Sequence, residues 1–388
     1  MKRITACILI FVLIMSMSTP LYADGGAPMA ETGNQNTMDV NAESAVLMDF
    51  NTGSILYAKN ENTALPPASV TKIMTLLLIM EAVKSGKLSY DTEISVSESA
   101  ASMGGSQVFL EAGERMRVDE LLKCVVVASA NDAALALAEA IAGSEGAFVS
   151  LMNKRAEELG MKSTRFENVT GLDDDTKEHL TSALDIALMS RELMKHEKIF
   201  EYSTLWMDSI RNGSFGLTNT NRLIRFYNGA TGLKTGSTSK AGFCISATAE
   251  RDGLHLIAVI MGSPTRDERN NAAKTLLDYG FANYSLYSGH SGSVGEISVV
   301  GGDRDSIEGK YVDSEFLVPK GEEKNITVEY IYDTKITAPV KENETIGKVK
   351  YSLDGKVICE NDLISDRSVG EITFKKQLVR LIGGFLLK

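Results

Sequence analysis

The stretch "LPPASVTKIMTLLLIM", residues 65–80, places a lysine three residues after a serine at the start of a long apolar run. Two prolines just before the run favour a helix start. From Ser69 to Lys84 the chain has no Gly or Pro, and Gly86 is suited to end a helix. The run is apolar on nearly every side, so it predicts a helix that lies inside a domain.

Lys72 is out of place in such a helix unless it has a function or reaches the surface. Its simpler interpretation is a lysine whose stem packs while its charge stays in water. The other interpretation makes it a base for Ser69, because side chains three apart on a helix share one face. A lysine is a base when burial or a nearby cation keeps it neutral. Ser69 at the helix N-terminus would also bring free backbone N–H groups to a reacting carbonyl.

Two tripeptides later in the chain support the second interpretation. Ser129–Asn131 is the one S-x-N in the sequence and Lys234–Gly236 the one K-T-G, and they follow S-V-T-K in that order. This ordered set is typical of penicillin-binding proteins and class A β-lactamases. A second S-x-x-K, from Ser237 to Lys240, lies between glycines in a strand-like region. In a strand, three residues do not make a helical turn that would bring the serine and the lysine together. This second S-x-x-K is therefore set aside.

The order of predicted elements indicates an α/β fold. A hairpin is expected in residues 44–62, around Asn-Thr-Gly, and mostly helix from about 117 to 200. Two or three strands follow in residues 232–262, and a helix closes the region at 267–284. A sheet covered by helices accounts for this order.

The composition changes after about residue 288. Residues 289–370 alternate apolar and polar side chains and carry an Asp-Gly turn at 354–355, which predicts a small all-β domain. Residues 371–388 place apolar side chains on one helical face and basic ones opposite. That pattern is typical of a helix in a membrane interface, and the alternative is a helix docked on its own domain.

The N-terminus resembles an export signal. Lys2 and Arg3 precede a short apolar run, and residues 1–23 read as a cleaved signal peptide, with an uncleaved anchor as the alternative. Residues 24–40 are expected to be a mobile lead-in. The net charge of −11 makes nucleic acid an improbable partner. Four separated cysteines and four histidines show neither a disulfide framework nor metal-ligand spacing.

On these motifs the chain resembles the low-molecular-weight penicillin-binding proteins, which are serine D-alanyl-D-alanine carboxypeptidases. The resemblance covers "SVTK", "SAND", "GLKTGSTSKAGFC", "SPTRDERNNAAKTLLDYGF", the β domain and the tail. It implies a penicillin-binding/β-lactamase-like sheet flanked by helices in a catalytic domain, residues 41–288, with a smaller C-terminal all-β domain. It also implies D-Ala-D-Ala stem peptides of peptidoglycan as substrates, β-lactams as covalent inhibitors, and no metal or organic cofactor. The expected location is the outer face of the cytoplasmic membrane, reached through residues 371–388.

The resemblance assigns the reacting groups. Ser69 would attack the carbonyl between two D-alanines, form an acyl-enzyme and release the terminal D-alanine. Lys72 would take the proton of the serine, although the identity of the base is disputed in related enzymes. Ser129 would relay a proton to the leaving amine, while Asn131 would position Lys72 and the substrate amide.

The K-T-G strand would bind the substrate. Lys234 would attract its carboxylate and keep Lys72 neutral, and Thr235 would donate a hydroxyl to the same carboxylate. Gly236 would let the substrate lie close to the backbone. The backbone N–H groups of Ser69 and Ser237 would form the oxyanion hole, each worth about 3–4 kcal/mol.

Several alternatives remain open at this point. Arg269 is either a second carboxylate anchor or a surface arginine at a helix start. A β-lactamase would need a glutamate that holds water, and Glu167 is present without the E-x-x-L-N arrangement of class A enzymes. A non-catalytic wall-binding protein would have no need for a buried lysine beside a serine. Endopeptidase action on D-alanyl cross-links depends on how far the cleft extends.

Overall fold

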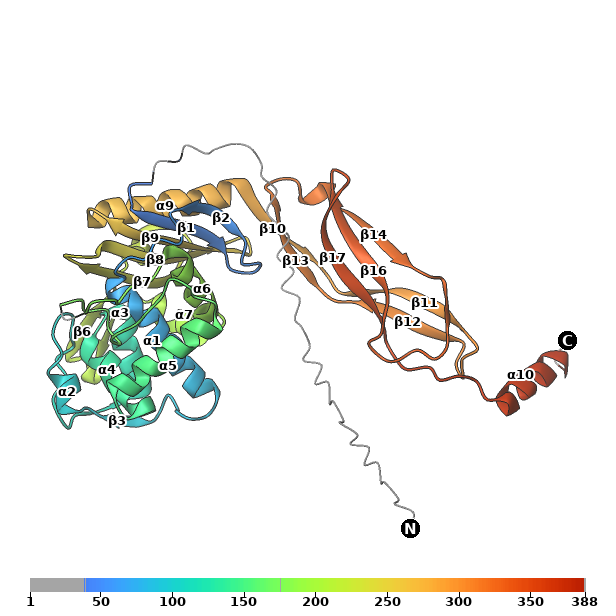
Figure 1. Ribbon diagram of the computed structural model, residues 1–388, viewed down its shortest axis with the longest axis horizontal. Helices are drawn as coiled ribbons and strands as arrows, with labels where there is room; N and C mark the ends of the chain where they lie inside the picture. Colours follow the sequence, from blue (N-terminus) through green and yellow to red (C-terminus); the bar gives the residue numbers. More distant parts are fainter. Residues whose placement is uncertain (1–37, 39, 175, 387–388) are drawn as a thin grey trace, which may run out of the picture.

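The computed structural model describes residues 38, 40–174 and 176–386. The expected signal peptide and nearly all of the expected lead-in lie outside these residues. The described chain forms two regions, a helix-covered sheet followed by a region of β-strands (Figure 1).

The first region is built on a five-stranded antiparallel sheet with the order β2-β1-β9-β8-β7. Its strands are β1 (Ser44–Asp49), β2 (Ile55–Lys59), β7 (Ala230–Thr238), β8 (Gly242–Arg251) and β9 (Leu254–Ser263). The predicted hairpin at Asn-Thr-Gly and the turn at Asp252-Gly253 are both confirmed. The first and last parts of this region therefore meet in one sheet, because β1 pairs with β9.

Helices cover both faces of this sheet (Figure 1). The helices of the region are α1 (Lys72–Lys84), α2 (Glu98–Ala101), α3 (Val118–Val127), α4 (Asn131–Ala142), α5 (Glu145–Glu158), α6 (Ala183–Met194), α7 (Lys198–Ser203), α8 (Leu223–Phe226) and α9 (Arg266–Asn283). Two short antiparallel pairs lie beside them. They are formed by β3 (Glu93–Ser95) with β4 (Arg115–Arg117) and by β5 (Met207–Ile210) with β6 (Phe215–Thr218).

Strand β9 shows why the sequence of the sheet is almost continuously apolar. Val259 faces α1 and α6, while Ile260, the next residue, faces α9. Successive side chains of a strand point to opposite faces, and here both faces are buried. Helix α1 is likewise buried on nearly every side, as its composition predicts.

The second region contains a six-stranded sheet with the order β14-β16-β17-β12-β11-β15 and a two-stranded pair, β10-β13. Its strands are β10 (Tyr284–Gly289), β11 (Gly292–Val300), β12 (Ser306–Tyr311), β13 (Ser314–Pro319), β14 (Thr327–Tyr332), β15 (Lys335–Thr337), β16 (Thr345–Leu353) and β17 (Lys356–Ser365). Because β10 pairs with β13, β pairing begins at Tyr284, slightly before the boundary that the composition suggests. The turn at Asp354-Gly355 joins β16 to β17 as predicted.

Helix α10 (Phe374–Leu386) follows the second region and extends away from it (Figure 1). Phe374, Leu378 and Ile382 are exposed on one side of this helix. Arg380 pairs with Asp305 of the β region at 2.7 Å, which is an anchoring contact for the helix. Among the described helices, no single one has both the length and the apolar composition needed to cross a bilayer; only the bent pair α4 and α5 reaches them together.

Candidate active site

The serine and lysine of S-V-T-K lie at the start of α1 and face one another. Ser69 belongs to a 3-10 turn, Ala68–Thr71, that leads directly into the helix. The Nζ atom of Lys72 lies 2.8 Å from the Oγ atom of Ser69 and donates a hydrogen bond of 2.9 Å to the carbonyl oxygen of Thr170. Lys72 has no exposed surface, so the alternative of a surface-reaching lysine is wrong.

The surroundings of Lys72 favour its neutral form. Burial lowers its pKa well below the ordinary value, and the charge of Lys234 lowers it further. Asp132 acts in the opposite direction. Its carboxylate is already engaged, because it accepts hydrogen bonds from the backbone N–H groups of Val108 and Leu110. An uncharged amine beside a serine hydroxyl can take up the serine proton.

The S-A-N tripeptide lies between α3 and α4 and presents unpaired polar atoms. Ser129 has a positive φ of 60°, and its buried Oγ atom has no hydrogen-bond partner in the described part of the chain. Asn131 Nδ2 donates to the carbonyl oxygen of Gly104 at 2.7 Å, while its buried Oδ1 atom is unpaired among those same residues. The amide of Asn131 therefore does not hold Lys72, contrary to the expectation; the carbonyl of Thr170 does so.

Strand β7 brings the K-T-G residues against the serine. Lys234 is buried and donates to the carbonyl oxygen of Thr235 at 2.8 Å. Burial, helped by the charge of Arg269, lowers the pKa of Lys234 to about 7. A Cβ atom at Gly236 would lie 2.7 Å from the backbone nitrogen of Ser69, so only glycine lets the strand come this close.

Arg269 projects from α9 toward the same place. Its side chain is buried, with 3% of its surface exposed, so the alternative of a surface arginine is wrong. It donates to Asn270 Oδ1 at 2.9 Å, and it lines the cavity above Ser69. Burial, together with the neighbouring Arg266, lowers its pKa to about 10. It remains a cation near neutral pH.

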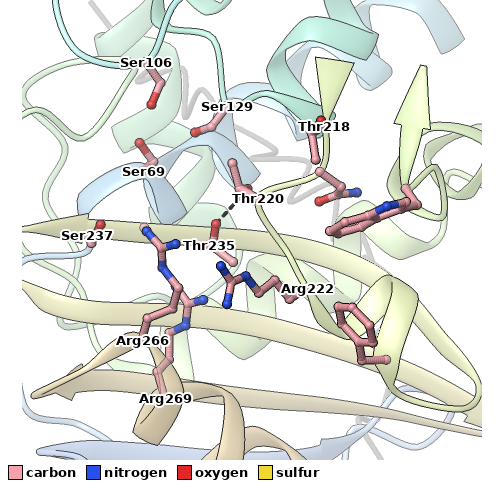
Figure 2. Close-up of a pocket in the computed structure, with 14 residues that line it drawn as sticks. Ser69, Ser106, Ser129, Thr218, Thr220, Arg222, Thr235, Ser237, Arg266 and Arg269 are labelled. Carbon is pink, nitrogen blue, oxygen red and sulfur yellow. Dashed lines mark hydrogen bonds between the residues drawn. The ribbon is translucent and has the colours of Figure 1, made fainter. Parts of the chain in front are cut away.

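Ser69, Ser129 and the end of the K-T-G strand open onto a cavity of about 640 Å³ (Figure 2), whereas the buried Lys72, Asn131 and Lys234 are not among its lining residues. The residues that line it are Ser69, Ser106, Ser129, Trp206, Thr218, Asn219, Thr220, Arg222, Phe226, Thr235, Gly236, Ser237, Arg266 and Arg269. Among these described residues three are arginines and none is acidic. The cavity is thus suited to an anionic ligand.

Part of this lining could not be found by sequence reasoning. Thr220 accepts a hydrogen bond of 2.8 Å from Thr235, and Arg222 and Arg266 add two cations. Thr220 and Arg222 lie in no stretch quoted for the resemblance, and Arg266 lies in one without a signal for its own role. The nearest signal is the sequence "TNTNR" at 218–222, which has no specific meaning without the fold.

A loop between α5 and α6 packs against the turn that carries Ser69. The carbonyl of Thr170 accepts the bond from Lys72, and a Cβ atom at Gly171 would lie 1.8 Å from the carbonyl oxygen of Ala68. His179 Nε2 is 2.8 Å from the hydroxyl of Thr71, and His179 Nδ1 accepts from the N–H of Glu167. His179 is therefore a neutral ring that donates through Nε2.

The structure also decides two of the motif alternatives. The carboxylate of Glu167 is exposed and accepts bonds from the backbone N–H groups of Lys177 and Glu178, so it does not line the cavity. Lys240, of the second S-x-x-K, is exposed and donates to the carbonyl oxygen of Asp173. Neither residue contributes a reacting group to the cavity.

Comparisons with known proteins show the family of the chain. The D-alanyl-D-alanine carboxypeptidase family model matches residues 30–265, and the C-terminal domain of penicillin-binding protein 5 matches residues 282–371. The D-alanyl-D-alanine carboxypeptidase DacF of Bacillus subtilis is 40% identical over 97% of this chain and 98% of its own length. DacA of Haemophilus influenzae is 35% identical over 86% of each chain.

Solved structures give the same result. Penicillin-binding protein 5 from Haemophilus influenzae superposes with a TM-score of 0.76 at 33% identity, over 86% of this chain and 98% of that one. The ampicillin-bound form of penicillin-binding protein D2 from Listeria monocytogenes gives a TM-score of 0.57 at 31% identity, over 62% of this chain and 98% of that one. The α/β fold with an appended β domain is thereby confirmed.

Proposed function

The chain belongs to the D-alanyl-D-alanine carboxypeptidase family of penicillin-binding proteins, and we propose that Ser69 is the nucleophile of its reaction. The protein is a serine D-alanyl-D-alanine carboxypeptidase of cell-wall peptidoglycan metabolism and a target of penicillins. One observation carries the assignment of the nucleophile: a fully buried lysine lies 2.8 Å from the hydroxyl of Ser69.

In the acylation step Lys72 takes the hydroxyl proton while Ser69 attacks the carbonyl between the two D-alanines. The C–N bond breaks, and the oxyanion is stabilised by the backbone N–H groups of Ser69 and Ser237. Close packing of Gly236 against Ser69 supports this pairing, because it places strand β7 beside the nucleophile. The proton passes from Lys72 through Ser129 to the leaving amine.

The substrate is bound by the cations and polar atoms on either side of Ser69. Lys234, Thr235 and Arg269 bind the terminal carboxylate, since charge-assisted hydrogen bonds are the strong ones. The unpaired Oδ1 atom of Asn131 accepts from the substrate amide N–H. A buried acceptor without a partner is costly, so substrate binding relieves that cost. Water then hydrolyses the acyl-enzyme.

We further propose that the enzyme is exported and acts at the outer face of the cytoplasmic membrane. Residues 1–23 are the proposed signal and residues 371–388 the proposed membrane contact. Support comes from Phe374, which is 80% exposed, and from Leu378 and Ile382 on the same side of α10. Exposed apolar side chains on a helix with basic neighbours are typical of interfacial helices.

The nucleophile is tested by brief exposure to penicillin followed by mass spectrometry of peptides. The proposal expects one adduct on Ser69, together with release of D-alanine from a pentapeptide by the untreated protein. An adduct on any other residue would refute the assignment. Rapid repeated turnover of nitrocefin would instead indicate a β-lactamase.

A further inference from the structure

Arg266 lines the cavity but has no task in the proposed mechanism. It is the first residue of α9, and its side chain points toward strand β7 (Figure 2). The side chain is exposed and forms neither an ion pair nor a hydrogen bond with any described residue. A guanidinium group donates hydrogen bonds and does not accept them, so it is available to an anionic group of a ligand.

The pairing of the strands places Arg266 at the Ser237 end of the site. Ser237 pairs with Phe243 of β8, and Phe243 pairs with Ser263 of β9, so the three residues form one row across the sheet. Arg266 follows Ser263 by three residues and begins α9, which packs against β9 and β8. It therefore lies at the end of the sheet that this row marks.

Arg269 lies one row nearer to Thr235. It is one helical turn further along α9, and it donates to the carbonyl oxygen of Cys244, which is the strand partner of Gly236. The two arginines of α9 are thus separated along the direction of β7. Arg269 is close to the K-T-G residues that bind the terminal carboxylate, and Arg266 is further from them.

The substrate runs along the same direction. In the proposed mechanism its terminal carboxylate is bound by Lys234, Thr235 and Arg269, and its reacting carbonyl lies at the N–H of Ser237. The acyl part of the peptide therefore leaves the site beyond Ser237, which is the side of Arg266. The residue that precedes the two D-alanines has to pass this guanidinium.

The charge of Arg266 is unfavourable in the protein without a ligand. A cation in the first turn of a helix lies at the positive end of the helix dipole. Arg269, three residues later, adds repulsion between like charges. Burial and then Arg266 lower the pKa of Arg269 to about 10. Asp267 and Glu268 lie in the same turn but form no ion pair with Arg266. A negative charge on a bound ligand would relieve this repulsion.

We propose that Arg266 binds a carboxylate of the residue that precedes the two D-alanines, so that the enzyme selects stem peptides with a second negative charge at this position. The inference rests on the proposed function, because the same peptide reacts at Ser69. In a stem peptide this position holds a diamino acid, whose far end either carries a carboxylate or lacks one. A guanidinium group matches a carboxylate in shape as well as in charge.

The test compares kcat/KM for release of D-alanine from three peptides, Nα-acetyl-X-D-alanyl-D-alanine. X is meso-diaminopimelate, the same residue with its far carboxylate converted to an amide, or L-lysine. The first two differ by one charge and hardly in size. We expect the wild type to favour the free carboxylate over the amide and over lysine about fivefold, as for an exposed ion pair. Sodium chloride at about 0.5 M should reduce this preference, because salt screens exposed charges.

Variants of Arg266 assign the preference to this side chain. Arg266→Gln should release D-alanine from the three peptides with similar kcat/KM. Arg266→Lys keeps the charge without the planar fork and should retain part of the preference. Arg304→Gln removes an exposed, unpaired arginine of the β region and is the matched control, which should keep the wild-type preference.

Two results would overturn the role of Arg266. One is a wild-type enzyme with equal kcat/KM for the free acid and the amide. The other is an Arg266→Gln enzyme that keeps the wild-type preference; if all three peptides then react more slowly by the same factor, Arg266 acts on the terminal carboxylate instead. Absence of both D-alanine release and a Ser69 penicillin adduct would refute the proposed nucleophile and not the selectivity.

Discussion

Lys72 and Thr170 are joined by a hydrogen bond of 2.9 Å between the amine and a backbone carbonyl, across 98 residues of sequence. This bond and the 2.8 Å contact with Ser69 fix the position of the amine. A backbone carbonyl carries no formal charge, so it orients the lysine without the full charge stabilisation that a carboxylate would give. The hydrogen bond to Thr170 can therefore hold Lys72 in place while its pKa stays low.

The first prediction concerns the base. Lys72→Met should retain the fold and reduce kcat for D-alanine release by about 10²–10⁴-fold, the usual contribution of a general base. D-Alanine release and the rate of penicillin adduct formation measure the effect. Lys240→Met is the control, because Lys240 also follows a serine by three residues but is exposed. A folded Lys72→Met enzyme with the wild-type rate would contradict the mechanism.

The pH dependence of kcat/KM should be bell-shaped. Lys72 must be neutral to act as a base, so activity should fall on the acid side. Lys234 must be charged to bind a carboxylate, and its pKa in the free enzyme is about 7. The value of kcat/KM, which reports on the free enzyme, should therefore decline as the pH rises above about 7.

The variant Lys234→Arg separates the two sides of this profile. Arginine keeps its charge at any pH used in an assay, so the decline on the alkaline side should move to higher pH. The acid side should remain. A wild-type profile that is flat from pH 6 to pH 9 would contradict the assignment of Lys234.

Close packing at Gly236 gives a third prediction. In Gly236→Ala the new methyl group would meet the backbone nitrogens of Ser69 and Val70 and displace the turn. We expect penicillin acylation to slow by about 10²–10³-fold, as for loss of an oxyanion donor. Gly216→Ala, in β6, is the matched control, since its methyl group would enter open space. Equal acylation rates for the two variants would refute the role of this contact.

His179 should make stability depend on pH. Burial lowers its pKa to about 4, against an ordinary value near 6.5, so the unfolded chain binds the extra proton more readily. The neutral ring contributes at most about 3 kcal/mol to the free energy of unfolding. This contribution is full above about pH 6.5 and is lost as the pH falls toward 4. Urea unfolding should show the advantage of wild type over His179→Gln shrinking across this range.

The control for this measurement is His290→Gln, because His290 is exposed in the β region. Its unfolding free energy should follow that of the wild type at each pH. His255 carries a similar shift, but it is present in every variant and cancels in the comparison. A difference in unfolding free energy between the wild type and His179→Gln that does not change with pH would contradict a neutral, buried His179 ring.

The proposed membrane contact can be tested by removing residues 371–388. Deletion of residues 371–388 should leave D-alanine release unchanged and abolish binding to vesicles of phosphatidylcholine and phosphatidylglycerol. Replacement of Phe374, Leu378 and Ile382 by serine should also weaken vesicle binding, because these exposed side chains would supply the apolar contact with the membrane. Vesicle binding that survives the deletion would show that α10 serves another purpose.

Much of the fold and the centre of the site follows from local patterns. The buried helix after Ser69, the strands around Lys234 and the hairpin turns have sequence signals that act over a few residues. The ordered motifs add the expectation that three distant segments meet. The sheet explains how they do so, because β7 runs directly beside the turn that carries Ser69.

The remaining groups depend on contacts that no local pattern encodes. Thr170 acts through a backbone carbonyl, so its side chain carries no signal. The resemblance predicts that Asn131 positions Lys72, but Nδ2 of Asn131 donates to the carbonyl of Gly104 and its Oδ1 has no partner among the described residues. Trp206 and Arg222 lie in the cavity because of how residues 205–226 fold over strand β7, which depends on tertiary packing.

The contact between Gly236 and Ser69 joins segments more than 160 residues apart, and it exists only when β7 has closed the sheet. Before that, Lys72 is an ordinary protonated lysine in water and the serine is inert. An unfolded polypeptide of this sequence therefore does not react with the amides around it. If Ser69 is the reactive group, the yield of covalent labelling by penicillin measures the fraction of correctly folded molecules in a preparation.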